Sequence, residues 1–286
     1  MKMQFNRYRN LEKYKEDVLS LLLEKEAENN LPISIISNTD PSDTSEWLMS
    51  TITDEFGTIQ LTALCTKPFN IVLSAPTDEY NSDCIKFLTD ELSRINFAPP
   101  GVFAKTKLAR DFTDNFLQNI SKPMQQKKRI LSMVLMRLDK LNAYEKALGS
   151  SRLLTEDDLS YVPLWEQAFC VDCHLPAFSL ADNQERIKTR IDKNTHFIWV
   201  DKVPVAQAVH GRDTPNGAVI TWVYTPPLFR GRGYATSVVA ELSQSRLNNG
   251  KKFCCLFADA NNPASRSIYR KLGYYDVDYY EQIEYV

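Results

Sequence analysis

The residues whose types and spacing could do chemistry are concentrated in a basic, glycine-containing turn at residues 230–236. Arg230 and Arg232 alternate there with Gly231 and Gly233. Glycine has no Cβ and reaches left-handed backbone conformations at little cost, so the main chain at Gly231 and Gly233 can approach a bound phosphate closely. The two guanidinium groups can donate forked hydrogen bonds to phosphate oxygens. The turn therefore predicts a binding site for a phosphate or diphosphate.

The elements that flank this turn must hold it in place, and their patterns are clear. Residues 218–224 are rich in β-branched and aromatic side chains, which predicts a strand that leads into the turn. Apolar residues then recur at helical spacing from Ala235 to Leu247, until Asn249-Gly250 ends the pattern. The turn thus precedes a helix N-terminus, where unpaired N–H groups and the helix dipole attract anions. Neither the ending of a Walker loop nor the G-x-G-x-x-G dinucleotide fingerprint is present.

A second motif lies downstream. Residues 252–258 are expected to form another buried strand, and Asn262-Pro263 then begins a short helix, with asparagine as the N-cap and proline at the first helical position. Gly273 ends that helix.

The two motifs together resemble the acyl-CoA-dependent N-acyltransferases of the GNAT superfamily. Arg230, Gly233 and Ala235 fit the family pattern Arg/Gln-x-x-Gly-x-Gly/Ala, which cradles the diphosphate of coenzyme A. Residues 262–274 resemble the family's Asn-Pro…Tyr-x-x-x-Gly-Phe block. The clear match covers residues 196–286, and the sequence of its motifs most resembles a bacterial subgroup of predicted acetyltransferases.

The resemblance implies a set of site residues. Those expected to contact acetyl-CoA are Val223, Tyr224, Thr225, Arg230, Gly231, Arg232, Gly233, Tyr234, Ala235, Thr236, Asn262, Ser265 and Tyr269. A main-chain N–H at Tyr224, or at Val223 beside it, is expected to polarise the thioester carbonyl. Tyr269 is expected to protonate the departing thiolate, and a structural core tyrosine is the alternative. No metal is expected.

No general base stands out in the sequence. His210 lies on the predicted strand next to the one that enters the turn and is a candidate catalytic residue, although a lone histidine is more often structural. Glu166 and Asp182 fall in the region that forms the acceptor wall in relatives, and a water chain could equally deprotonate the amine. The acidic and aromatic segment 279–285 could line a site for a cationic amine, but an edge strand is the simpler interpretation.

Composition sets wider bounds. The 286 residues suit two domains, and a net charge of −2 argues against a general nucleic-acid partner. No run approaches the roughly 20 apolar residues of a membrane helix and no signal core follows the N-terminus, so a cytoplasmic location is expected. Its six cysteines are then expected to stay reduced. Cys170-x-x-Cys173-His174 fits the pattern for haem attachment. We favour a helix whose cysteine face packs inward, with haem, redox and zinc roles as the alternatives.

The predicted fold class is α+β with two domains. Residues 129–286 are expected to form a GNAT domain, a mixed and mostly antiparallel central sheet flanked by helices in the order β-α-α-β-β-β-α-β-α-β. Residues 1–128 are interpreted as a degenerate GNAT-like copy that does not bind acyl-CoA. The interpretation rests on a short parallel between residues 64–69 and 223–228, for which chance is the rival explanation.

The predicted reaction follows from the resemblance. Acetyl is expected to move from acetyl-CoA to the primary amine of a small molecule by direct attack, with the protein holding both reactants in line. The alternatives are a non-catalytic acyl-CoA-binding regulator and an acetyltransferase that acts on a protein or peptide amine. A monomer or homodimer without nucleic-acid or membrane partners is expected.

Overall fold

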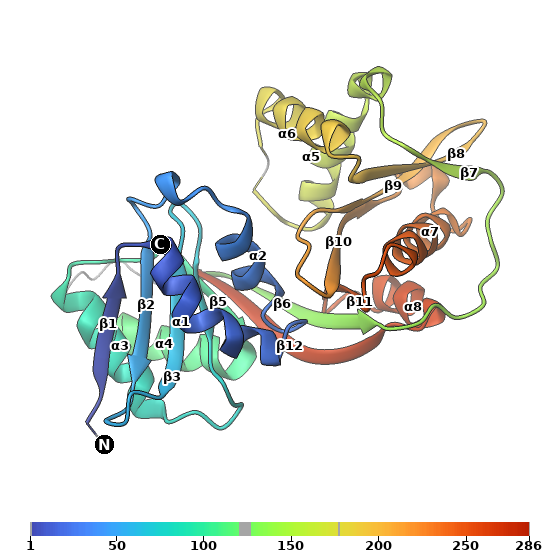
Figure 1. Ribbon diagram of the computed structural model, residues 1–286. Coiled ribbons are helices and arrows are strands. Elements are labelled where there is room, and N and C mark those ends of the chain that lie inside the picture. Colours follow the sequence, from blue (N-terminus) through green and yellow to red (C-terminus); the bar gives the residue numbers. More distant parts are fainter. Residues whose placement is uncertain (1, 120–126, 177, 286) are drawn as a thin grey trace. The chain divides into compact units, whose positions relative to one another are not determined.

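A computed structural model describes residues 2–119, 127–176 and 178–285, which divide into two compact units (Figure 1). Unit 1 comprises Met1–Leu135 and Val277–Val286, and unit 2 comprises Met136–Asp276. This division differs from the predicted boundary at residues 128/129. The cause is the last strand, whose residues 280–284 pair with residues 101–105 of unit 1.

Unit 1 is a sheet with helices on both faces. Its strands are β1 (Gln4–Tyr8), β2 (Leu48–Thr53), β3 (Ile59–Cys65), β4 (Ile71–Ser74), β5 (Gly101–Lys105) and most of β12 (Tyr275–Tyr285). Its helical elements are α1 (Leu11–Glu24), α2 (Asn30–Asn38), the 3-10 turn η1 (Pro41–Asp43), α3 (Ser82–Arg94) and α4 (Thr106–Asn119). The strand order is β1-β2-β3-β4-β5-β12, and only β4 and β5 pair in parallel.

Alternation along β2 explains how this sheet buries both faces. Leu48 and Ile52 belong to the core that includes α3 and α4, whereas Met49 belongs to the core beneath α1 and α2. Successive side chains of a strand point to opposite faces, so the apolar run at residues 48–52 supplies both cores.

Unit 2 repeats the same plan. In chain order its elements are β7 (Ser150–Leu153), η2 (Glu156–Ser160), α5 (Val162–Asp172), α6 (Leu180–Asp192), β8 (His196–Asp201), β9 (Val203–His210), β10 (Gly217–Tyr224), η3 (Pro227–Phe229), α7 (Tyr234–Asn248), β11 (Phe253–Asp259) and α8 (Pro263–Leu272). Its strands follow the order β11-β10-β9-β8-β7, with only β10 and β11 parallel. Helices α5 and α6 lie on one side of this sheet and α7 on the other (Figure 1). Strand β6 (Lys127–Leu138) belongs partly to each unit.

The shared element order corrects the short sequence parallel. In both units a strand and two helices precede three antiparallel strands, and a helix, a strand and a helix then follow. Strand β10 therefore corresponds to β4. Residues 66–68, which the sequence parallel set against residues 225–227, lie instead in the hairpin between β3 and β4.

One further expectation changes. Strand β12 was expected at an edge over residues 279–285, but in the strand order it lies between β5 and β6. Its partner β5 ends at Lys105, and α4 begins at Thr106.

Candidate active site

Strand β10 separates from its parallel neighbour just before the predicted anion site. Its pairing with β11 covers Gly217 to Val219 and goes no further, although β10 continues to Tyr224. On its other side β10 contains a bulge, because three steps from Thr221 to Tyr224 face two steps from Val209 to Gln207 on β9. A bulge leaves its extra residue out of the ladder and bends the strand. The last residues of β10 are thereby freed from β11.

The bulge residue is Trp222, which has a left-handed φ of 53°. A bulky residue in this region is a backbone outlier and needs support from its surroundings. The Gln207 side chain supplies part of that support by donating from Nε2 to the Trp222 carbonyl at 3.4 Å. The bulge directly precedes Val223 and Tyr224, the residues whose N–H groups are the predicted carbonyl-polarising donors.

The turn after β10 has the geometry that its glycines predict. Gly231 and Gly233 have φ of 78° and 79°, and Gly233 is the N-cap of α7, so the helix has no side-chain cap. A Cβ added at Gly231 would meet nothing within 4 Å, and one added at Gly233 would make only an ordinary 3.7 Å contact with Ala147. The requirement for glycine at both positions is therefore conformational rather than steric.

The main-chain amides at this turn are available to a ligand. The first backbone hydrogen bond of α7 is donated by Ser237 N to Gly233 O at 3.0 Å. Within the described chain, no acceptor is assigned to the N–H groups of residues 231–236, which include predicted contacts Arg232, Tyr234, Ala235 and Thr236. Several convergent donors at a helix N-terminus form a site for an anion. The residues present therefore fit a diphosphate.

Arg230 makes two contacts within the protein. Its guanidinium donates to the Thr225 carbonyl at 2.9 Å and to Asp172 at the end of α5 at 2.5 Å. These contacts link Arg230 to the start of the turn and to α5. Arg232 is exposed in the middle of the turn, and the Tyr234 hydroxyl donates to Asp201 at 2.5 Å. The Thr225 hydroxyl is buried and has no hydrogen-bond partner in the described structure.

Helix α8 carries the second motif as expected. The Asn262 side chain accepts from Ser265 N at 3.1 Å and caps the helix. Tyr269 is 8% exposed, and burial raises the pKa of its hydroxyl to about 12, against a smaller lowering by a hydrogen bond with Ser265. The hydroxyl is therefore protonated at neutral pH and can donate a hydrogen bond.

An aromatic wall on α5 faces the end of β10. The Phe169 ring lies 5.0 Å from that of Trp222, and the Trp165 ring lies 6.2 Å from that of Tyr224. Two arginines of α6 complete the wall, with Arg190 4.9 Å and Arg186 5.5 Å from the Trp222 ring centre. Aromatic rings at these distances contribute through their edges and faces as well as their area.

Glu166, a predicted acceptor-wall residue, lies behind this wall and is fully buried in an ion pair with Arg190. Burial raises the pKa of Glu166, and the attraction of Arg190 opposes that shift. Asp182 is instead exposed at the start of α6, where its carboxylate accepts from the Ser179 hydroxyl at 2.7 Å. Neither carboxylate is presented as a free base.

His210, at the end of β9, pairs with the middle of β10. Its Cα pairs with that of Ile220, and its Nδ1 lies 3.5 Å from Asp213, which also binds Arg246. Three residues lie between Ile220 and Tyr224, and the four steps span about 13 Å of strand. His210 is thus paired with Asp213 and set back along β10 from Tyr224.

The cysteine motif is a helix end. Cys170 is buried on α5, Cys173 is its C-cap residue, and both are free thiols. Burial raises the pKa of Cys173 to about 11, so its thiol is protonated at neutral pH. These properties are those of the inward-packed helix favoured from the sequence.

The corresponding turn of unit 1, residues 75–81 between β4 and α3, has opposite chemistry. It contains Asp78 and Glu79 but neither glycine nor arginine. The side chain of Asn81 accepts from Asp83 N at 2.9 Å and caps α3, and Asp83 adds an acid in the first helical turn. A phosphate would meet a capped helix and carboxylates here.

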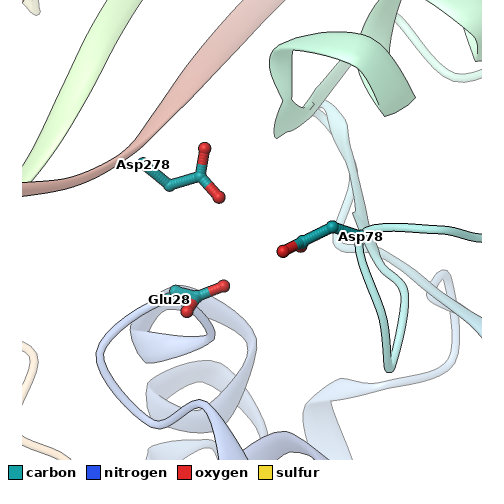
Figure 2. A group of neighbouring side chains, drawn as sticks. All are labelled: Glu28, Asp78 and Asp278. Atoms are coloured by element: carbon teal, nitrogen blue, oxygen red, sulfur yellow. The ribbon is translucent and has the colours of Figure 1, made fainter.

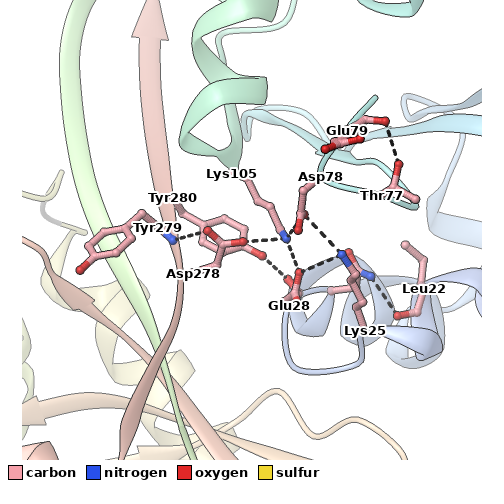
Figure 3. Close-up of polar contacts among 11 residues, drawn as sticks. Leu22, Lys25, Glu28, Thr77, Asp78, Glu79, Lys105, Asp278, Tyr279 and Tyr280 are labelled. Carbon is pink, nitrogen blue, oxygen red and sulfur yellow. Dashed lines mark hydrogen bonds and ion pairs between the residues drawn. The ribbon is translucent and has the colours of Figure 1, made fainter. Parts of the chain in front are cut away.

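Glu28, Asp78 and Asp278 lie near one another in unit 1 (Figure 2), and Lys105 lies between them (Figure 3). Among the described residues, these three acids form the group whose ligand atoms are close enough to hold a metal ion. Lys105 Nζ lies 2.6 Å from Asp78 and 2.7 Å from Asp278, and it also pairs with Glu28. Burial alone would lower the pKa of Lys105, but hydrogen bonds to the three acids raise it. An ammonium thus already neutralises the position that a cation would take.

Comparisons with known proteins agree with this geometry. Residues 200–283 match the family model described as FR47-like protein. An acetyltransferase from the GNAT family of Colwellia psychrerythraea aligns over 100% of both chains, with a TM-score of 0.58 and 12% identity. A GCN5-related N-acetyltransferase from Sphaerobacter thermophilus covers 99% of this chain and 95% of its own, with a TM-score of 0.64 and 12% identity. The chain therefore has the GNAT fold.

Both halves of the chain share the GNAT fold. A tandem GNAT protein from the clavulanic acid biosynthesis pathway covers 99% of this chain and 98% of its own, with a TM-score of 0.58 and 11% identity. No sequence among the curated proteins matches this chain. No helix in the described ranges is long and apolar enough to cross a membrane.

Sequence reasoning missed several residues of this candidate site. Trp222, Asp172, Arg186 and Arg190 were not singled out, although all four lie around the end of β10. The spacing of apolar and polar residues along α5 and α6 shows that each helix packs on one face. It does not show which strand or residue that face contacts.

Proposed function

We propose that unit 2 is an N-acetyltransferase that moves acetyl from acetyl-CoA to the primary amine of a small molecule. The observation that carries the proposal is the row of free amides at residues 231–236, next to a β10 that has separated from β11. Acetyl-CoA, when bound, supplies an acetyl group activated as a thioester.

The chain's own groups would act in three ways. The amides from Gly231 to Thr236 would bind the diphosphate, with Arg230 positioning the turn through Asp172. The N–H of Val223 or Tyr224, next to the bulge at Trp222, would polarise the reacting carbonyl. Tyr269 would donate a hydrogen bond to the departing sulfur.

The pKa of about 12 at Tyr269 sets a limit on this last role. An ordinary thiol has a pKa of about 8.5, so complete proton transfer from Tyr269 to a thiolate is uphill by several pKa units. Hydrogen-bond donation avoids that cost. We therefore assign Tyr269 to stabilisation of the leaving group, and the amine's proton to water, because Glu166 is paired with Arg190.

The test is a binding and turnover experiment on the full chain. Titration calorimetry with coenzyme A and acetyl-CoA measures binding, and thiol release measures turnover with a panel of small amines. Binding with release by a small amine supports the proposal. Binding without release by any amine or peptide would identify an acyl-CoA-binding regulator, and release with peptides alone would identify a protein acetyltransferase.

We further propose that unit 1 is a copy of the fold that does not bind acyl-CoA. Its turn lacks glycine, the Asn81 side chain caps its helix, and Glu28, Asp78 and Asp278 surround Lys105 nearby. The expected stoichiometry is one coenzyme A per chain. A second equivalent that survives substitution of Gly233 would contradict this assignment.

A further inference from the structure

The acceptor wall of unit 2 contains a guanidinium without an acidic partner. Arg186 on α6 is half-buried, and its Cζ lies 3.9 Å from the Phe178 ring centre and 5.5 Å from that of Trp222. Within the described residues no ion pair or hydrogen bond to a carboxylate is found for it. An arginine held by two aromatic rings keeps its planar N–H edge free and already oriented.

The positive charge of Arg186 is not balanced by the charged side chains around it. Glu166 is the buried acid of this wall, and it is committed to Arg190, which also packs on Trp222. The three ionised side chains therefore sum to one positive charge. Glu166 attracts Arg186 electrostatically but makes its hydrogen bond with Arg190.

The position of Arg186 links this charge to the proposed chemistry. Trp222, on which it packs, is the bulge residue and directly precedes the Val223 and Tyr224 amides. A group bound to the free edge of Arg186 would lie beside the end of β10, on the α6 side. The phosphates belong to the α7 N-terminus, which has its own donors.

We infer that Arg186 binds a carboxylate of the acceptor, so that the acceptor is an amine that also carries a carboxylate, such as an α-amino acid. This inference rests on the proposed function of the same site. Phe178 and Trp222 would supply the apolar walls, and the guanidinium would make a forked pair with the carboxylate. Arg186 is thus a specificity-determining residue.

The test compares two acetylated compounds that differ only in this charge. N-acetylalanine and N-acetylalaninamide are titrated into the full chain, and binding is followed by NMR. The acid should bind about ten- to a hundred-fold more tightly than the amide, as expected for one forked charged pair. Arg186→Met should abolish that difference without weakening amide binding, and Arg186→Lys should keep part of it.

Lys188→Met is the matched control, since Lys188 lies on the same helix, is 53% exposed and pairs with Glu185 at 3.7 Å. It should leave the preference for the acid intact. Equal binding of acid and amide to the unsubstituted chain, or equal weakening of both by Arg186→Met, would overturn the inference. If the acid is preferred but no amine releases thiol from acetyl-CoA, the proposed function fails and the carboxylate site stands.

Discussion

Substitution of Gly233 by valine tests the cradle most directly. Gly233 has φ of 79° and caps α7. Left-handed backbone costs an L-residue about 1–2 kcal/mol, and a β-branched residue is a clear outlier there. The nearest atom to an added Cβ is 3.7 Å away, so collision adds little to this strain. The substitution should relax the turn toward negative φ and rotate its amides away from a shared phosphate.

The effect on binding follows from the hydrogen bonds lost. Each charge-assisted bond from an amide to a phosphate oxygen contributes about 1.5–3 kcal/mol, so loss of one raises the Kd for coenzyme A about 10- to 150-fold. Loss of two would bring binding below detection. Titration calorimetry of Gly233→Val with coenzyme A measures this change.

A matched control separates strain from loss of the site. Gly250 lies just beyond the other end of α7, has φ of 90° and has nothing within 4 Å of an added Cβ. Gly250→Val should cost similar stability and leave the Kd unchanged. If Gly233→Val binds coenzyme A as tightly as Gly250→Val does, the assignment of the diphosphate to this turn is refuted.

Three further outcomes are expected. Tyr269→Phe should lower kcat about ten- to a hundred-fold while the Kd for coenzyme A stays within about twofold, because only leaving-group stabilisation is removed; an unchanged kcat would make the hydroxyl structural. Lys105→Met should lower the free energy of urea unfolding by about 2 kcal/mol, because three carboxylates lose their cation. Lys107→Met, whose ion-paired side chain is 69% exposed, should lower it by less than about 0.5 kcal/mol. Equal losses of stability in the two variants would contradict this account. Burial alone would raise the pKa of Asp158, but its hydrogen bonds, of which the one with Arg152 has the largest effect, lower the pKa to about 2. Since its unfolded pKa is near 3.8, Asp158 should contribute about 2 kcal/mol above about pH 4 that is lost as the pH falls towards about 2. Asp158→Asn should remove that acid slope from unfolding curves.

The cradle could be predicted from the sequence because its determinants are local. The left-handed conformations of Gly231 and Gly233, the strand before them and the start of α7 all depend on residues within one short stretch. The same holds for Asn262, whose capping bond reaches only three residues along α8.

The rest of the site depends on contacts between distant residues. The bulge at Trp222 arises from its register against β9, and no property of tryptophan predicts a positive φ. Arg230 donates to Asp172 on helix α5, a contact between residues far apart in the chain that the sequence does not show. His210 was a candidate because it neighbours β10 in the sheet, but the sequence does not show which residue of β10 it pairs with.

The pairing of β12 with β5 governs the order in which the protein can fold as it is synthesised. Residues 280–284, which complete the sheet of unit 1 beside Gly101–Lys105, are translated after every residue of unit 2. Until then β5 has an unpaired edge, and Lys105 lacks Asp278. The sheet of unit 1 is therefore completed only when this late segment of the chain adds beside β5.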